Sequence, residues 1–203
     1  MNALASKLSP SITNMIRVDH THVLSNFHQY DPEASDGTRQ ALVNQICLAL
    51  EIHAQLEEEI FYPAMRAVAG NNEVLNKSAP EHDQMRQLIG RLRDMTPADL
   101  TYDSTFMDLM RDVMHHVADE ETVLLPEAER LLADRLNELG AQMTKRRLQL
   151  AAPHTGEIAM NTMRTMPASS MLVAAGALLA GGYLFKRSRG WHFRQPGSLG
   201  HRR

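Results

Sequence analysis

Residues 53–63 read HAQLEEEIFYP, and residues 116–126 read HVADEETVLLP. Each segment has a His, a Glu four positions later and a Pro ten positions after the His, so the second segment repeats the pattern of the first. Both segments fall within helical patterns of apolar residues, where an i, i+4 spacing places the His and the Glu on one face of the helix. We therefore expect two equivalent helices, each presenting one imidazole and one carboxylate to the same interior.

A second pair of motifs precedes these segments at a nearly constant distance. The separation between Asp19-His20 and His53 matches that between Glu81-His82 and His116 to within one position. The chain thus repeats one unit, a helical hairpin with an early His and a late His/Glu pair. Apolar residues recur at helical spacing over residues 12–27, 42–68, 85–92 and 106–131. Four amphipathic helices joined by short loops predict an all-α fold, an antiparallel up-down-up-down four-helix bundle.

Local signals suggest where these helices begin and end. Ser9-Pro10 is typical of the start of a helix, and Ser78-x-x-Glu81 is a capping box that we expect to open the third helix. Gly70-Asn71-Asn72 is expected to end the second helix. Pro63 and Pro126 are each expected to kink or end the helix that contains them.

Composition divides the chain into unlike parts. Residues 1–157 carry 14 basic and 24 acidic groups, a net charge of -10, whereas residues 158–203 carry seven basic groups and no acidic one. We expect an N-terminal arm at 1–9, the bundle at 10–140, a linker at 141–167, a candidate transmembrane helix at 168–185 and a basic tail at 186–203. Residues 168–185 are all uncharged and would form a helix about 27 Å long, which is a marginal membrane span.

These features exclude several classes of function. One cysteine, Cys47, rules out an intrachain disulfide framework, a Cys-based zinc site and a c-type haem, and we expect it to be a packing residue. The acidic body argues against nucleic acid as a partner. The stretch from Met1 to Met15 has no apolar signal region, so we expect a membrane-associated protein with a cytoplasmic bundle, or otherwise a cytoplasmic one. Nothing resembles a nucleophile elbow or a phosphate loop, so no conventional organic substrate is expected.

Six ionisable residues interrupt the four apolar faces, and we predict that they bind metal. In an up-down bundle the six lie at similar depths, so they can meet in one layer of the core. Burying them without partners would cost several kcal/mol each. Four imidazoles and two carboxylates suit a pair of iron-like ions, with manganese or zinc also compatible. The predicted ligands are His20, His53, Glu57, His82, His116 and Glu120.

Helical phase separates these residues from their neighbours. His22 points away from the face of His20, and His115 lies off the stripe that holds His116. We expect His22 and His115 on the surface. Glu58 and Glu121 are expected on a solvated face, with Glu58 as a candidate additional ligand.

The motifs Asp19-His20, His53-x-x-x-Glu57, Glu81-His82 and His116-x-x-x-Glu120 resemble the hemerythrin-like domain of the HHE cation-binding family. The resemblance covers roughly residues 10 to 135. It implies a non-haem di-iron centre with an oxo or hydroxo bridge, in which the four His are terminal ligands and the two Glu bridge the ions. Related domains bind oxygen, sense oxygen or iron, and respond to nitric oxide and peroxide.

One residue departs from the oxygen-carrier pattern of that family. Carriers have two His at i, i+4 on the third helix, whereas the fourth position after His82 is Arg86. We therefore expect a centre that binds, senses or reduces O₂, NO or peroxide, or that handles iron, rather than a carrier. The alternative is a membrane-tethered structural or adaptor bundle in which the metal is only a staple.

Overall fold

The computed structural model describes residues 10–165 of the chain, and within this range every regular element is helical and there is no strand. The long helices are interrupted by two short π-helical turns, labelled η1 and η2, and one 3₁₀ turn, η3. The elements are α2 (Ile12–Phe27), α3 (Asp36–Leu56), η1 (Glu57–Phe61), α4 (Tyr62–Arg66), α5 (Glu73–Asp94), α6 (Tyr102–Asp119), η2 (Glu120–Leu124), α7 (Leu125–Leu131), α8 (Leu136–Ala151), η3 (Ala152–His154) and α9 (Thr155–Thr165).

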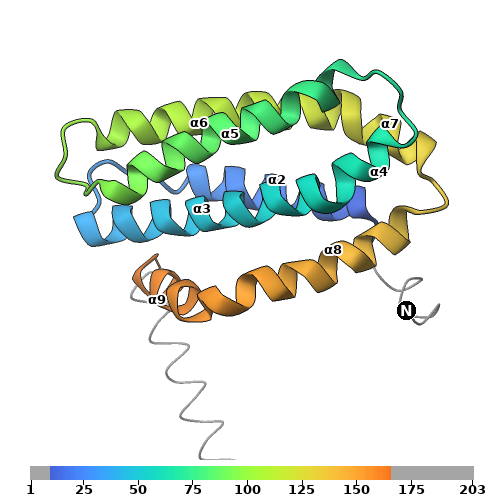
Figure 1. Cartoon of the computed structure of the whole chain (residues 1–203). Coiled ribbons are helices and arrows are strands. Elements are labelled where there is room, and N and C mark those ends of the chain that lie inside the picture. Colours follow the sequence, from blue (N-terminus) through green and yellow to red (C-terminus); the bar gives the residue numbers. More distant parts are fainter. Residues whose placement is uncertain (1–9, 166–203) are drawn as a thin grey trace, which may run out of the picture. The chain divides into compact units, whose positions relative to one another are not determined.

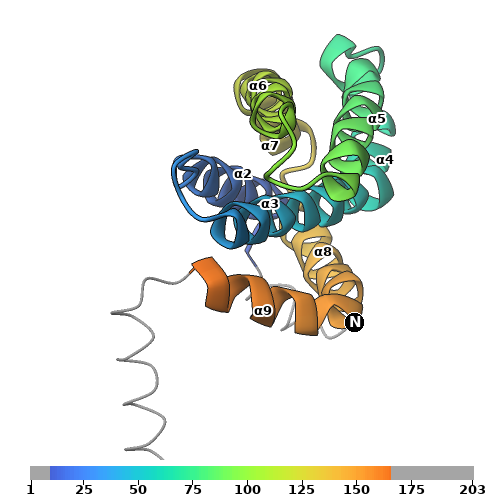
Figure 2. The same ribbon diagram turned by 90° about the vertical axis from the view of Figure 1, so that its left-hand side faces the viewer.

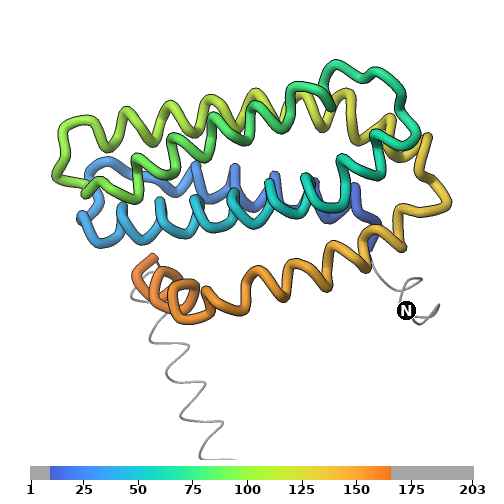
Figure 3. The backbone as a smooth tube through the Cα atoms, viewed as in Figure 1, coloured from blue at the N-terminus to red at the C-terminus, as the bar shows by residue number. Residues whose placement is uncertain are grey.

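Four antiparallel helical rods form the bundle (Figures 1 and 3). The first rod is α2, the second continues from α3 through η1 into α4, the third is α5, and the fourth continues from α6 through η2 into α7. The prediction of an all-α antiparallel four-helix bundle is confirmed. The predicted C-terminal apolar helix lies outside the described residues.

Two helix starts differ from the sequence-based prediction. The first helix begins at Ile12, because the Ser11 side chain accepts the backbone N–H of Asn14 and caps it. The third helix begins at Glu73, where the Asn72 side chain accepts the N–H of Leu75. Ser78 is therefore not a cap. It lies inside α5 and donates its hydroxyl to the Val74 carbonyl.

Pro63 and Pro126 do not end the helices that contain them. A π-helical turn lies directly before each of them, and the backbone N–H groups of Tyr62 and Leu125 bond to the carbonyls of Glu57 and Glu120, five positions earlier. Pro lacks an N–H and clashes with the preceding turn, so one widened turn allows the helix to continue. Each π turn begins at a predicted bridging Glu.

Residues 141–165 of the predicted linker are helical in the structure. Residues 136–165 form α8 and α9, which lie outside the four rods, on the side of α2 and α3 (Figure 2). Gly140 lets α8 approach the start of the bundle closely, since a Cβ there would lie 2.0 Å from the carbonyl oxygen of Pro10. Leu139 and Met143 are buried in this contact.

Two apolar clusters fill the bundle, and a polar layer separates them. One cluster contains Phe27, Ile46, Leu92 and Phe106, and the other contains Ile16, Phe61, Met65 and Leu124. The six predicted ligands fall between these clusters along every rod. The fold therefore seals the polar layer on both sides with apolar side chains, as a water-poor site requires.

The predicted transmembrane segment 168–185 and the basic tail 186–203 lie outside the described residues, as does the arm 1–9. Among residues 10–165, no helix is both long enough and apolar enough to cross a membrane. Membrane association stays a prediction from sequence.

Candidate metal centre

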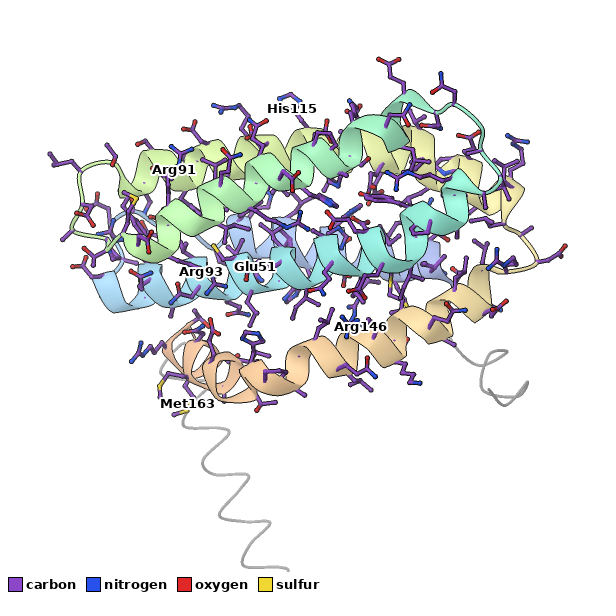
Figure 4. The ribbon with its side chains drawn as sticks, viewed as in Figure 1. Glu51, Arg91, Arg93, His115, Arg146 and Met163 are labelled. Carbon is purple, nitrogen blue, oxygen red and sulfur yellow. The ribbon has the colours of Figure 1, made fainter. Side chains whose placement is uncertain are left out.

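The structure brings all six predicted ligands together in the polar layer, and none of their side chains is more than 8% exposed. Each rod supplies its part at a similar depth. His20 comes from α2, His53 from α3, Glu57 from the start of η1, His82 from α5, His116 from α6 and Glu120 from the start of η2. The helical phase predicted from sequence holds at the neighbouring positions, since His22 and His115 are exposed; His115 points away from the bundle in Figure 4.

Each of the four imidazoles has its Nε2 atom close to a buried carboxylate. Glu57 Oε2 lies 3.3 Å from His53 Nε2, 3.4 Å from His82 Nε2 and 4.0 Å from His116 Nε2. Glu120 Oε2 lies 3.4 Å from His20 Nε2 and 3.7 Å from His116 Nε2. Both carboxylates thus lie between imidazoles of different rods.

The acid that precedes each early His orients the late His of the same hairpin. Asp19 Oδ2 lies 3.4 Å from His53 Nδ1, and Glu81 Oε2 lies 2.9 Å from His116 Nδ1. A carboxylate on Nδ1 favours the tautomer that leaves Nε2 free to bind a metal.

The acid that follows each predicted bridging Glu orients the early His of the other hairpin. Glu58 Oε1 lies 2.9 Å from His82 Nδ1, and Glu121 Oε1 lies 3.0 Å from His20 Nδ1. The expectation that Glu58 and Glu121 only form a solvated face is wrong, because both are partly buried against an imidazole. Each of the four imidazoles therefore has a carboxylate at its Nδ1 atom.

Arginines hold two of these four carboxylates in turn. Arg147 of α8 donates from both terminal nitrogens to Asp19, at 2.6 and 2.5 Å. Arg86 Nη2 donates to both oxygens of Glu58, at 2.8 and 2.7 Å. Arg86 thus supports His82 through Glu58, and α8 reaches His53 through Asp19.

Tyr62 is a functional candidate that the sequence analysis did not identify. Its buried hydroxyl lies 2.9 Å from Glu120 Oε1 and 3.1 Å from Glu57 Oε2. Tyr62 is the fifth position after Glu57, a spacing that an α-helix places on different faces and that the i→i+5 bonding of η1 brings together. The equivalent position of the second hairpin is Leu125, so the hydroxyl breaks the internal symmetry.

Charges within the layer shift the pKa values of the metal-free protein. Burial opposes ionisation of Glu57, but the imidazoles of His53, His116 and His82 outweigh it and lower its pKa well below the usual range. Burial also disfavours charged His116, yet Glu57, Glu81 and Glu120 raise its pKa to about 10. Burial together with both carboxylates raises the pKa of Tyr62 far above that of a free phenol. In the metal-free protein His116 is therefore protonated at neutral pH, and a metal ion that binds to it would displace this proton.

A cation fits this arrangement. Within residues 10–165, the atoms His20 Nε2, His53 Nε2, Glu57 Oε1 and Glu120 Oε2 are buried and have no hydrogen-bond partner. Two sets of ligand atoms lie within 4.8 Å of one another, the first from His20, His53, Glu57 and Glu120 and the second from Glu57, His82 and His116. Glu57 belongs to both sets. Nitrogen and carboxylate donors of this kind suit iron, manganese or zinc.

Comparison with known proteins agrees with this geometry. Residues 11–128 match the family model of the hemerythrin HHE cation binding domain. The chain belongs to this family. All four motifs described above fall within the matched residues, and membership together with the buried His/Glu cluster points to metal binding.

Two known proteins are similar to this chain. A crystal structure of a hemerythrin HHE cation binding domain-containing protein from Mycobacterium kansasii superposes with a TM-score of 0.61 at 20% identity, covering 76% of this chain and 99% of that one. At this identity the match shows the fold alone. A DNA nickase from Nostoc sp. (strain PCC 7120) is 28% identical over 120 residues, 59% of this chain and 34% of the nickase. The chain thus spans about a third of the length of that relative.

Proposed function

We propose that this HHE domain binds two iron ions in the polar layer and that the resulting non-haem centre binds and reduces O₂, NO or peroxide. The observation that carries the proposal is the set of buried, unpartnered nitrogen and oxygen atoms that converge between the two apolar clusters. Such atoms are costly unless a cation is their partner. The carboxylates behind the imidazoles support the same conclusion, because they orient Nε2 as metal sites require.

The proposed ligands divide between the two ions. His20, His53, Glu57 and Glu120 would hold one ion, and His82, His116 and Glu57 would hold the other. Glu120 Oε2 lies 3.7 Å from His116 Nε2, which supports its proposed role as the second bridge. Iron, when bound, supplies exchangeable electrons and coordination positions for a small ligand.

The surroundings favour a ligand of very few atoms. A cavity of about 10 Å³ borders the layer, lined in part by His53, His82, Met85 and His116. That volume accommodates about one water-sized molecule. O₂, NO or one end of a peroxide fits this space, whereas an organic substrate does not.

Tyr62 is proposed to orient the two bridging carboxylates through its hydroxyl. Its Oη lies between the carboxylates of Glu57 and Glu120, and burial keeps it protonated, since its pKa is raised. Tyr62 Oη is therefore a hydrogen-bond donor beside both proposed bridges and can orient these carboxylates. Arg86 takes the place of the second His of oxygen carriers and forms an ion pair with Glu58, which favours reduction or sensing over reversible carriage.

The similarity to the DNA nickase does not support DNA nicking by this chain. The matched segment covers about a third of the nickase, and residues 1–157 carry a net charge of -10. Phosphate backbones are bound mainly by clustered Lys and Arg, so an acidic body of this charge opposes such binding.

Metal analysis combined with electronic spectra of anaerobically purified protein tests the proposal. We expect about two iron ions per chain and a near-ultraviolet absorption band that forms in air and changes with azide or reductant. The double variant Glu57→Ala/Glu120→Ala should lose both. A protein that retains zinc and shows no such band would refute the redox proposal and favour a metal that only staples the bundle.

A further inference from the structure

A second cavity lies outside the polar layer, between the bundle and the added helices. Its volume is about 240 Å³, and it is bounded by α2, α3, α8 and α9. Most of its wall is apolar, with Leu48, Ala49, Ile52 and Ala151 among the lining residues. Ile158 of α9 also lines it and is 38% exposed, so the rim beside α9 is open to solvent.

Besides His53 Nε2, which belongs to the polar layer, three polar atoms of residues that line this cavity are buried without a partner in the described part of the chain. They are Asn161 Nδ2, Gln45 Oε1 and Arg147 Nε. The Asn161 side chain belongs to a residue that is only 4% exposed. Native proteins rarely bury amide groups without partners, so these atoms indicate a ligand that supplies both an acceptor and a donor.

We propose that the cavity between α2, α3, α8 and α9 binds an uncharged, mainly apolar small molecule with one polar group that both accepts and donates hydrogen bonds. The cavity volume is below the range typical of pockets for drug-sized ligands, so it suits a molecule with about one ring. The nitrogen and oxygen of Asn161 and Gln45 exchange places on a rotation of the amide, and a group of this kind matches either orientation.

Charge selects the neutral molecule over an anion or a cation. Arg147 reaches the cavity, but its terminal nitrogens are already bonded to Asp19, so the two charges are paired. A carboxylate can only accept hydrogen bonds, and it would be buried against a mainly apolar wall whose arginine, Arg147, is already paired with Asp19. A cation would find the Asp19 carboxylate occupied in the same pair. A hydrocarbon would leave all three polar atoms unmet.

The cavity also borders the polar layer, because it is lined by one of the predicted metal ligands. Asp19 and His53 both line it, and Asp19 is the carboxylate on His53 Nδ1. The site does not depend on the proposed iron chemistry, because none of the three unpartnered polar atoms is a predicted metal ligand. A molecule bound in the cavity would, however, lie beside Asp19, the carboxylate that orients His53.

Benzamide is a suitable probe, since it combines one ring with an uncharged amide. Its affinity for the full chain, as purified, is measured by ligand-detected NMR titration, with benzoate and toluene as comparators. We expect saturable binding of benzamide that is at least tenfold tighter than that of either comparator. Absence of saturable benzamide binding, or equal binding of all three molecules, would overturn the proposal.

Three variants locate the binding. Ala49→Leu should fill the cavity and abolish the binding of benzamide, whereas Ala159→Leu, on an exposed position of α9, should leave it unchanged. Asn161→Ala removes a partner without adding volume and should weaken binding about fivefold, the effect of one hydrogen bond. If Ala49→Leu and Asn161→Ala bind benzamide like the unaltered chain while circular dichroism shows them folded, the molecule binds elsewhere and the assignment is wrong.

Discussion

The two predicted bridging carboxylates are expected to contribute unequally to metal binding. Glu57 Oε2 lies within 4.0 Å of three imidazoles and belongs to both sets of ligand atoms, whereas Glu120 belongs to one. We therefore predict that Glu57→Gln binds fewer than one ion per chain and that Glu120→Gln retains about one, held by Glu57, His82 and His116.

The magnitude follows from replacing a charge by a neutral amide of the same shape. Two unit charges about 4 Å apart interact by about 4 kcal/mol at an effective dielectric constant of about 20. A loss of that size lowers affinity by about a thousandfold, and a divalent ion makes it larger. An ion that depends on the substituted carboxylate should therefore be lost at micromolar concentrations of metal. In Glu120→Gln the other ion should stay bound.

The assay is metal analysis by mass spectrometry after dialysis, combined with chelator competition to obtain affinities. Glu59→Gln is the matched control, because Glu59 is close to Glu57 in the chain, exposed and paired with Arg146 of α8. It should bind as many ions as the unaltered chain. If Glu120→Gln loses both ions while Glu57→Gln retains one, the assignment of Glu57 as the shared ligand is refuted.

Three further predictions concern the layer and the tail. His20→Ala and His116→Ala should each lose metal, whereas His22→Ala and His115→Ala should keep it nearly intact; iron analysis of the four variants would contradict the helical phase if a surface variant lost metal and its neighbour did not. In the metal-free protein the pKa of His116 is about 10 in the folded state, above the usual value near 6.5, so its stabilising contribution is complete below about pH 6.5 and is lost as the pH rises through about 10. The melting temperature of that protein should fall over this range, and less steeply in His116→Gln; equal slopes would count against the raised pKa. Deleting residues 166–203 should abolish the predicted membrane association, and a shortened chain that still sediments with membranes would exclude the apolar segment as the anchor.

Residue spacing was sufficient to predict the bundle and the gathering of the six ligands. Apolar residues at helical spacing select which face of each helix is buried, and antiparallel packing then brings equal depths together. His20 and His116 could be distinguished from His22 and His115 for the same reason. Each of these inferences depends only on the helical rotation per residue, which is a property of the local chain.

The start of α5 and the role of α8 required the structure. Ser78-x-x-Glu81 is a valid capping pattern, but Asn72 caps an earlier turn, and burial of Leu75 extends the helix backward. Residues 141–165 contain the basic run Lys145-Arg146-Arg147 and Pro153, and they look like a linker in isolation. They become helical where Thr144 and Arg147 find partners on α2, in a distant part of the chain.

The sequence by itself determined the helical rods, their order and the six inward-facing metal-binding candidates, because these follow from local periodicity and from one internal repeat. Only the tertiary structure decided which carboxylate lies behind which imidazole, since Glu58 meets His82 and Glu121 meets His20 across different hairpins. It also decided the place of Tyr62, because a single π turn changes the face on which a residue five positions away emerges. Side-chain pairing between distant segments depends on how the rods pack and on the widened turns within them, neither of which is encoded in the spacing of any one helix.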